Sequence, residues 1–250
     1  KQDVAKDLPE KTETILFCEM GAEQRKIYDH FRQKYRDLLA KKIQTDGFHK
    51  AGVYILEGLL KLRQICNSPA LLAEKEGQFN PESTKMERLM QMLGEIVAEG
   101  HKVLVFSFFT GMLKLVEEKL DQTGIGHVKL TGQSRDREAL VEEFRTNDEK
   151  QVFLISLKAG GFGLNLSEAN YVFLIDPWWN PAVEQQAIDR THRIGQTRQV
   201  FAYKMICKNT IEEKILELQK KKQAVAKDII HTESGFLKQL KPADLEELFG

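Results

Sequence analysis

Three polar side chains in the last third of the chain have the types and spacing to bind a phosphate anion. Gln186, Arg190 and Arg193 are separated by four and three residues, and residues at i, i+4 and i+7 lie on one face of a helix. The sequence therefore predicts a short helix that presents one amide and two guanidinium groups on the same side. A guanidinium is always charged, and its planar fork matches phosphate oxygens. Ion pairs along the helix are the alternative role.

The segments before this predicted helix indicate how it is positioned. Residues 152–156 (VFLIS) and 171–176 (YVFLID) are apolar runs of strand length, as expected for parallel strands that are buried on both faces. Between them lies the loop 159–163 (AGGFG), where glycine allows the backbone N–H groups to approach a phosphate. A plain tight turn is the alternative for this loop. Ligands bind beyond the carboxyl ends of such strands, so we expect the loop and the helix at one edge of a sheet.

Strands and helices alternate regularly in the second part of the chain. Helices are expected at 84–98, 111–120 and 135–144, and strands at 102–107, 127–131, 152–156, 171–176 and 199–205. This alternation predicts an α/β fold, with a parallel sheet covered by helices on both faces.

The two ends of the chain have a different pattern. The N-terminal part predicts a strand at 12–19 and two helices at 22–43 and 53–65, and the C-terminal part predicts a helix at 210–230 and a short one within 236–249. We therefore divide the sequence into an N-terminal strand and helical region (1–83), an α/β region (84–207) and C-terminal helices (208–250).

Composition excludes several classes of protein. Lys plus Arg and Asp plus Glu number 37 each, so phosphate binding must come from local placement and not from overall positive charge. Cys18, Cys66 and Cys207 form no C-x-x-C pair, which favours ordinary buried thiols in a reducing compartment and argues against a metal site. No apolar run approaches the ~20 residues of a membrane span, and we expect no signal peptide. Because the first residue is Lys, we expect a fragment of a longer protein.

Three motifs resemble those of the Snf2 branch of the superfamily 2 helicase-like ATPases. Residues 189–196 (DRTHRIGQ) match the signature D-R-x-H-R-I-G-Q of motif VI in that branch, and residues 159–166 (AGGFGLNL) resemble motif V. Residues 62–69 (LRQICNSP) resemble L-R-Q-I-C-N-x-P, with Ser68 in place of the usual His. The resemblance extends from about Lys11 to the C-terminus. It implies the second, C-terminal RecA-like lobe of such an enzyme, with a helical protrusion and C-terminal helices.

The resemblance also implies roles for individual residues. Arg190 and Arg193 would be arginine fingers that act on the nucleotide held by the neighbouring lobe. Other nucleotide contacts would come from Gln186, Gly161, Gly163 and Asp189. Contacts with the DNA backbone would come from Ser107, Thr131, Gly132, Ser156, Lys158 and Trp179. Hydroxyl and N–H groups of this kind bind the sugar-phosphate chain without reading its sequence. For Trp179, core packing is the alternative.

The chain lacks the other half of a phosphoryl-transfer site. It contains no G-x-x-x-x-G-K-[ST] loop and no D-E-x-H sequence, the kinds of motif that hold ATP phosphates and Mg²⁺. The family carries these motifs on its first lobe. The resemblance therefore implies half of an ATP-dependent translocase, inactive as an ATPase alone. Its expected partners are the N-terminal lobe and double-stranded DNA, with protein–DNA complexes as substrates and no membrane. Its expected location is intracellular, in the cytoplasm or nucleoid of a prokaryote or the nucleus of a eukaryote.

Two alternative functions stay open. A strand-separating superfamily 2 helicase would act on RNA or single strands, but its motif VI is typically Q-R-x-G-R-x-G-R, whereas this chain has His192 and Gln196. A docking lobe without catalytic function need not keep Gln186, Arg190 and Arg193. Stimulation of ATP hydrolysis by duplex DNA, compared with RNA, separates the first alternative from the translocase.

Overall fold

The computed structural model describes residues 8–48, 50–72, 79–80, 83–159, 164–176, 181–223 and 240–250. The chain forms two compact units, one made of Lys1–Leu16 with Met86–Ile206 and the other of Phe17–Lys85 with Cys207–Gly250. Among the described residues, no helix combines the length and the apolar character that crossing a membrane requires.

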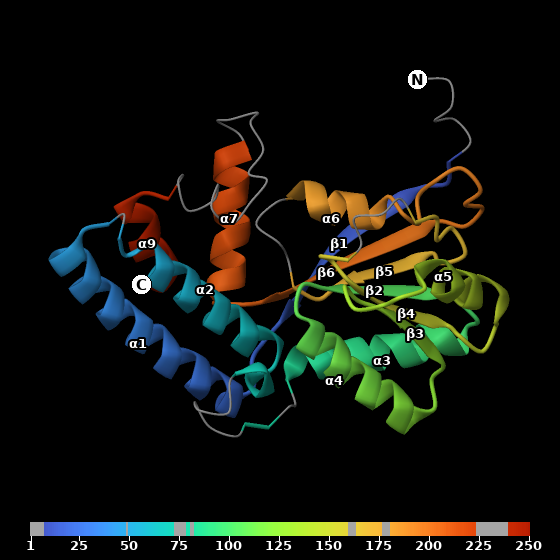
Figure 1. Cartoon of the computed structure of the whole chain (residues 1–250), viewed down its shortest axis with the longest axis horizontal. Helices are drawn as coiled ribbons and strands as arrows, with labels where there is room; N and C mark the ends of the chain where they lie inside the picture. The colour runs from blue at the N-terminus through green and yellow to red at the C-terminus, as the bar shows by residue number, and fades with distance from the viewer. Residues whose placement is uncertain are drawn as a thin grey trace. The chain divides into compact units, whose positions relative to one another are not determined.

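The centre of the first unit is a six-stranded sheet (Figure 1) with the strand order β1-β6-β5-β2-β4-β3. The strands are β1 (Lys11–Cys18), β2 (Val103–Ser107), β3 (His127–Leu130), β4 (Val152–Ser156), β5 (Tyr171–Leu174) and β6 (Val200–Cys207). The pairs β2–β4, β2–β5, β3–β4 and β5–β6 are all parallel. Every residue of β2 and β4 is buried, because helices cover both faces. The predicted α/β fold is confirmed.

Helices on both sides of this sheet supply its core. They are α3 (Thr84–Ala98), α4 (Thr110–Thr123), α5 (Arg137–Thr146) and α6 (Pro181–Ile188). Phe144 of α5 and Ile188 of α6 pack in one cluster with Phe106 and Phe153 of the strands, so α5 and α6 cover the same face. Figure 1 shows α3 and α4 on the side of the sheet opposite to α6.

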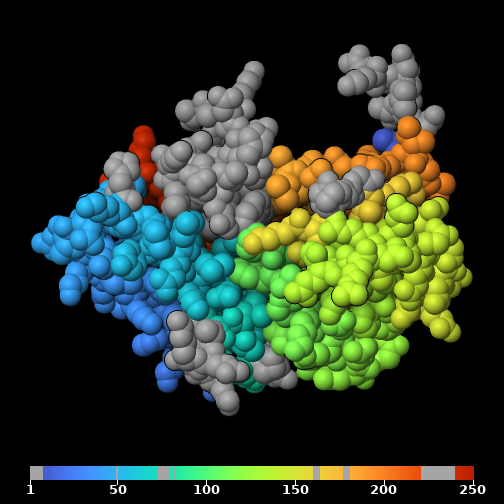
Figure 2. Space-filling view, in the orientation of Figure 1, coloured from blue at the N-terminus to red at the C-terminus, as the bar shows by residue number. Residues whose placement is uncertain are grey.

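The second unit is mainly helical. It contains α1 (Ala22–Asp46), α2 (Gly52–Asn67), the short 3₁₀ helix η2 (Pro69–Leu71), α7 (Ile211–Gln223) and α9 (Pro242–Phe249). Helices α1 and α2 pack side by side, as Figure 1 shows, and their surface is the blue and cyan part of Figure 2. Gly58 allows close packing here, because a Cβ atom at this position would lie 3.0 Å from both Tyr35 and Phe249. Of the helix predicted at 210–230, the part after Gln223 lies outside the described residues.

Tyr28 of α1 supports the first turn of α7. Its phenol oxygen accepts a hydrogen bond from the backbone N–H of Ile211 at 2.6 Å, and the residue is buried. The first N–H groups of a helix have no partner within the helix, so this bond satisfies one of them. Burial, and to a smaller extent Cys66, raise the pKa of Tyr28 well above its ordinary value.

We expect Tyr28 to make stability depend on pH in alkaline solution. A raised folded-state pKa gives a stabilisation that is complete below the unfolded-state pKa of about 10 and is lost as the pH rises through the folded-state pKa. The unfolding free energy of the wild type should therefore fall more steeply above about pH 10 than that of Tyr28→Phe. At neutral pH Tyr28→Phe should be about 1–3 kcal/mol less stable, because the N–H of Ile211 loses its acceptor. Urea unfolding at both pH values measures this, and parallel pH profiles would contradict it.

Candidate functional site

The helix that carries the predicted arginine face is shorter than the sequence suggested. α6 ends at Ile188, and residues 189–195 form turns and bends. Only Gln186 is therefore helical, and the prediction that Arg190 and Arg193 share its helix face is wrong. At the end of α6 the backbone hydrogen bonds change to a tighter pattern that spans three residues, because the N–H groups of Arg190 and Thr191 donate to the carbonyls of Ala187 and Ile188 at 3.3 Å and 3.0 Å. The carbonyl of Arg190 accepts from the N–H of Leu166 at 3.1 Å. Gly195, with φ of 102°, lies at the end of this turn and adopts a conformation that favours glycine.

The side chain of Gln196 holds this turn, and sequence reasoning assigned it no role. Its Nε2 lies 3.0 Å from the carbonyl oxygen of Ser167, 2.9 Å from that of Ala169 and 3.2 Å from that of Thr191, and its two hydrogens are shared among these three acceptors. Its Oε1 accepts from the N–H of Arg198 at 2.9 Å. Gln196 is buried. It joins the segment after the glycine-rich loop to residues 189–195, which we call the arginine turn because they contain Arg190 and Arg193. The sequence feature that could have indicated this role is the position of Gln196 as the last residue of the DRTHRIGQ signature.

The two arginines lie in different environments. Arg190 is 2% exposed, whereas Arg193 is exposed and its Nε donates to the carbonyl of Asp189 at 3.0 Å. Burial, and then the positive charge of Arg193, lower the pKa of Arg190.

A small hollow lies between the end of α6 and the sheet. It is lined by Phe106, Leu157, Val183, Gln186, Ala187 and Arg190, and its volume is about 10 Å³. This is close to the minimum that one water molecule needs. A nucleotide therefore does not fit within it and would have to approach Arg190 and Gln186 from outside the lobe.

The buried carboxylate of Asp176 joins the carboxyl ends of β2 and β5. It accepts from the N–H of Phe108 at 2.9 Å and 3.1 Å and from the hydroxyl of Ser107 at 3.1 Å. Lys158, which follows β4, places its ammonium 4.1 Å from the centre of the Phe108 ring. The structure therefore brings three strand ends together at one edge of the sheet. Sequence reasoning missed Asp176, although a charged residue at the end of the apolar run YVFLID was a visible signal.

The two serines predicted to contact DNA are buried. Ser107 and Ser156 are paired in register on β2 and β4, but they are 0% and 1% exposed. The Ser107 hydroxyl oxygen also accepts from the N–H of Phe109 at 3.1 Å. This burial does not support direct contact with a DNA phosphate, because the strands and their covering layers exclude solvent.

The other predicted residues have varied positions. Lys158 and Gly132 are exposed, and Thr131 is partly exposed. Asp189 accepts from the side chain of Gln185 at 2.7 Å, so part of its carboxylate is already hydrogen-bonded within the lobe. Three predicted residues lie outside the described residues: Gly161, Gly163 and Trp179.

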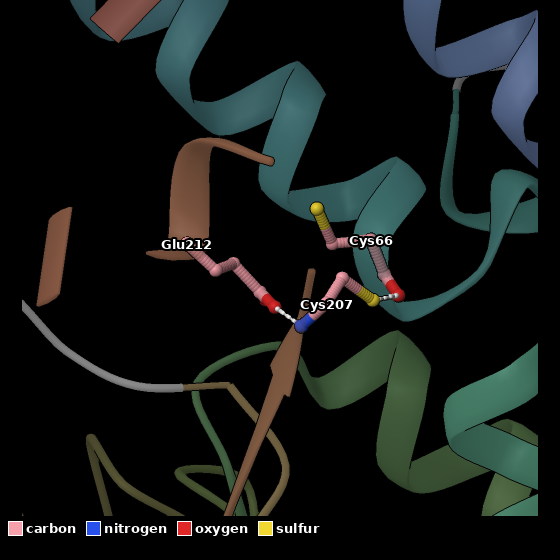
Figure 3. Close-up of side chains that lie close together, drawn as sticks. All are labelled: Cys66, Cys207 and Glu212. Carbon is pink, nitrogen blue, oxygen red and sulfur yellow. Dashed lines mark hydrogen bonds between the residues drawn. The ribbon is translucent and has the colours of Figure 1, made fainter. Parts of the chain in front are cut away.

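A second cluster, in the helical unit, has the composition of a metal site. Cys66, Cys207 and Glu212 place their ligand atoms within 4.8 Å of one another. Figure 3 shows the Glu212 carboxylate at the backbone nitrogen of Cys207, and the Cys207 sulfur directed at the carbonyl of Cys66. These hydrogen bonds measure 2.9 Å and 3.3 Å.

The cation of this cluster is Lys85. Its ammonium lies 2.6 Å from Oε1 of Glu212, and both side chains are 0% exposed. It also donates to the amide oxygen of Asn67 at 3.1 Å. Burial is the main cause that raises the pKa of Cys66 well above its ordinary value, and a metal would need the thiolate. We therefore interpret the cluster as a buried ion pair that joins Lys85 to α2 and α7, with Cys66 as a thiol.

Comparison with known proteins places the chain in a family. Residues 84–195 match the family "Helicase conserved C-terminal domain", and residues 1–71 match the family "SNF2-related domain". The Bacillus subtilis protein YwqA is 38% identical over 253 residues, which cover 99% of this chain and 27% of YwqA. The DNA excision repair protein CSB of rice is 35% identical over 259 residues, which cover 100% of this chain and 21% of CSB. The chain thus spans roughly a quarter of the length of these relatives.

Two solved structures from Sulfolobus solfataricus are similar over almost the whole chain. The SWI2/SNF2 ATPase core in complex with double-stranded DNA has a TM-score of 0.80 and 34% identity, over 99% of this chain and 52% of that one. The SWI2/SNF2 ATPase C-terminal domain has a TM-score of 0.76 and 32% identity, over 96% of this chain and 98% of that one. The fold, the DRTHRIGQ turn and these matches together show that the chain belongs to the Snf2 family of ATPases and corresponds to their C-terminal domain.

Proposed function

We propose that this chain is the second RecA-like lobe of an ATP-driven translocase that moves along duplex DNA. The observation that carries the proposal is the turn after α6. It holds the exposed Arg193 beside the buried Arg190, and Gln196 fixes its backbone. The same chain contains no phosphate-binding loop of the G-x-x-x-x-G-K-[ST] type. A lobe that has these two arginines but no such phosphate-binding loop fits the role of completing an active site whose other residues lie on a second lobe.

In this proposal the N-terminal lobe of the same protein holds ATP and Mg²⁺. When the two lobes close, Arg193 approaches the γ-phosphate and stabilises the negative charge that develops during transfer. Arg190 and Gln186 support this position from the end of α6. Arg193 is suited to this role because its side chain is exposed, while Arg190 is held within the lobe.

Duplex DNA is the proposed track. Lys158 and Gly132 are exposed, and Thr131 is partly exposed. Lys158 and Thr131 follow strands β4 and β3, at the carboxyl edge where ligands of α/β sheets bind. The match to an ATPase core solved with double-stranded DNA supports this choice. Alternate closing and opening of two lobes that each hold the DNA would produce movement. Protein–DNA complexes are the proposed substrates, and the proposed location is inside the cell, where this track lies.

The test is ATP hydrolysis by the full-length protein with and without duplex DNA. We expect duplex DNA to stimulate hydrolysis, and the 250-residue chain by itself to show none. Stronger stimulation by RNA or single strands would favour a strand-separating helicase. A folded full-length protein that has its first lobe but hydrolyses no ATP would favour a docking lobe.

A further inference from the structure

His192, inside the arginine turn, contacts a segment far away in the sequence. Its Nε2 lies 2.8 Å from the carbonyl oxygen of Pro9, 183 residues earlier in the chain. Both residues belong to the first compact unit. A carbonyl can only accept a hydrogen bond, so Nε2 must carry the proton and donate it. The contact therefore places a proton on Nε2 of His192 and points its ring at the segment that leads into β1.

Neighbouring contacts strengthen this connection. The carbonyl of Glu10 accepts from the N–H of Val200 at 3.0 Å, which begins the pairing of β1 with β6. The ammonium of Lys11 lies 4.0 Å from the carboxylate of Asp189, the first residue of the arginine turn. Segment 9–11 thus contacts both the residues that begin this turn and the strand that follows it.

These contacts fix the arginine turn to two other segments of the chain. On one side Gln196 ties it to the segment after the glycine-rich loop, and on the other side His192 ties it to segment 9–11. His192 lies between Thr191 and Arg193, so a shift of its backbone is passed directly to Arg193. Because a misplacement of about 1 Å in a catalytic group can cost about 100-fold in rate, a tie at this position matters for function.

We propose that His192 is a positioning residue that ties the turn carrying Arg190 and Arg193 to the segment 9–11 leading into β1. The orientation of the arginines is thereby linked to the part of the chain that precedes this lobe. This inference rests on the proposed function, in which that preceding part connects to the ATP-binding lobe.

The test compares three substitutions of His192 in the full-length protein. In His192→Gln the amide Nε2 occupies nearly the same place as the ring Nε2 and can still donate to Pro9. In His192→Asn the amide is too short to reach, and His192→Leu has no donor. We expect His192→Leu and His192→Asn to lower kcat for DNA-stimulated ATP hydrolysis by about 10- to 100-fold, with KM for ATP changed by less than about threefold. His192→Gln should stay within about threefold of the wild type.

A second readout does not depend on activity. Amide hydrogen exchange at residues 10–12 and 189–196 should become faster in His192→Leu and His192→Asn but not in His192→Gln. Equal exchange and equal kcat in all three variants would overturn the inference. Failure of the proposed function can be told apart from failure of this inference. If the proposed function is wrong, Arg193→Ala leaves ATP hydrolysis unchanged, whereas hydrogen exchange in the His192 variants still shows whether His192 holds segment 9–11. The melting temperature of each variant shows whether it is folded.

Discussion

Arg193→Ala in the full-length protein should lower kcat for DNA-stimulated ATP hydrolysis by about 10³- to 10⁵-fold, the contribution of an arginine finger in related reactions. The loss should fall on kcat and much less on KM for ATP, because the guanidinium meets charge that exists only in the transition state. Arg193 is exposed, so its removal should leave the fold intact. Arg193→Lys should recover little of the kcat that Arg193→Ala loses, since a lysine ammonium cannot replace the planar fork of a guanidinium.

Arg198 offers a matched control for this experiment. It is also exposed, and its guanidinium lies 3.4 Å from the ring of His101. Arg198→Ala removes the same charge only five residues further along the chain, so we expect kcat within about threefold of the wild type if position matters more than net charge. The assignment of Arg193 as an arginine finger fails if Arg193→Ala retains the wild-type kcat. It also fails if Arg198→Ala lowers kcat as much as Arg193→Ala does.

Lys85→Met should lower the unfolding free energy by about 3–5 kcal/mol, the typical effect of removing one partner of a buried ion pair. Lys85 and Glu212 are 0% exposed, so the variant leaves a carboxylate buried without its cation. Methionine fills much the same volume as the lysine stem, which keeps the effect of a cavity small. Urea unfolding followed by circular dichroism measures the difference.

The double variant Lys85→Met/Glu212→Gln should recover most of this loss. It removes the buried charge, and the glutamine amide oxygen can still accept from the N–H of Cys207, as the carboxylate does at 2.9 Å. As a surface control, Lys114→Met breaks the exposed pair with Glu118 at 3.8 Å, and we expect a change below about 1 kcal/mol. A similar loss in both single variants would show that burial of the Lys85 pair is not the cause.

Local patterns in the sequence determined the elements and the family. The runs 103–107 and 152–156 became fully buried parallel strands, because a strand covered on both faces is apolar along most of its length, and both strands are apolar up to their final serine. The signature DRTHRIGQ pointed to the Snf2 family without any structural information, and the matches confirm the family. These features depend on residues that are close together in the chain, and so a sequence can show them.

Only the tertiary structure decided the connections that hold the candidate site. Asp176 accepts from Ser107 across 69 residues. In the helical unit, Lys85 likewise donates to Glu212 across 127 residues. The turn after α6 also makes a tertiary contact, in which the carbonyl of Arg190 accepts from the N–H of Leu166. No local spacing contains this information. Each contact joins segments that become neighbours only when parallel strands align their carboxyl ends and helices pack around them, so the partners of these polar groups follow from the fold and not from the order of residues.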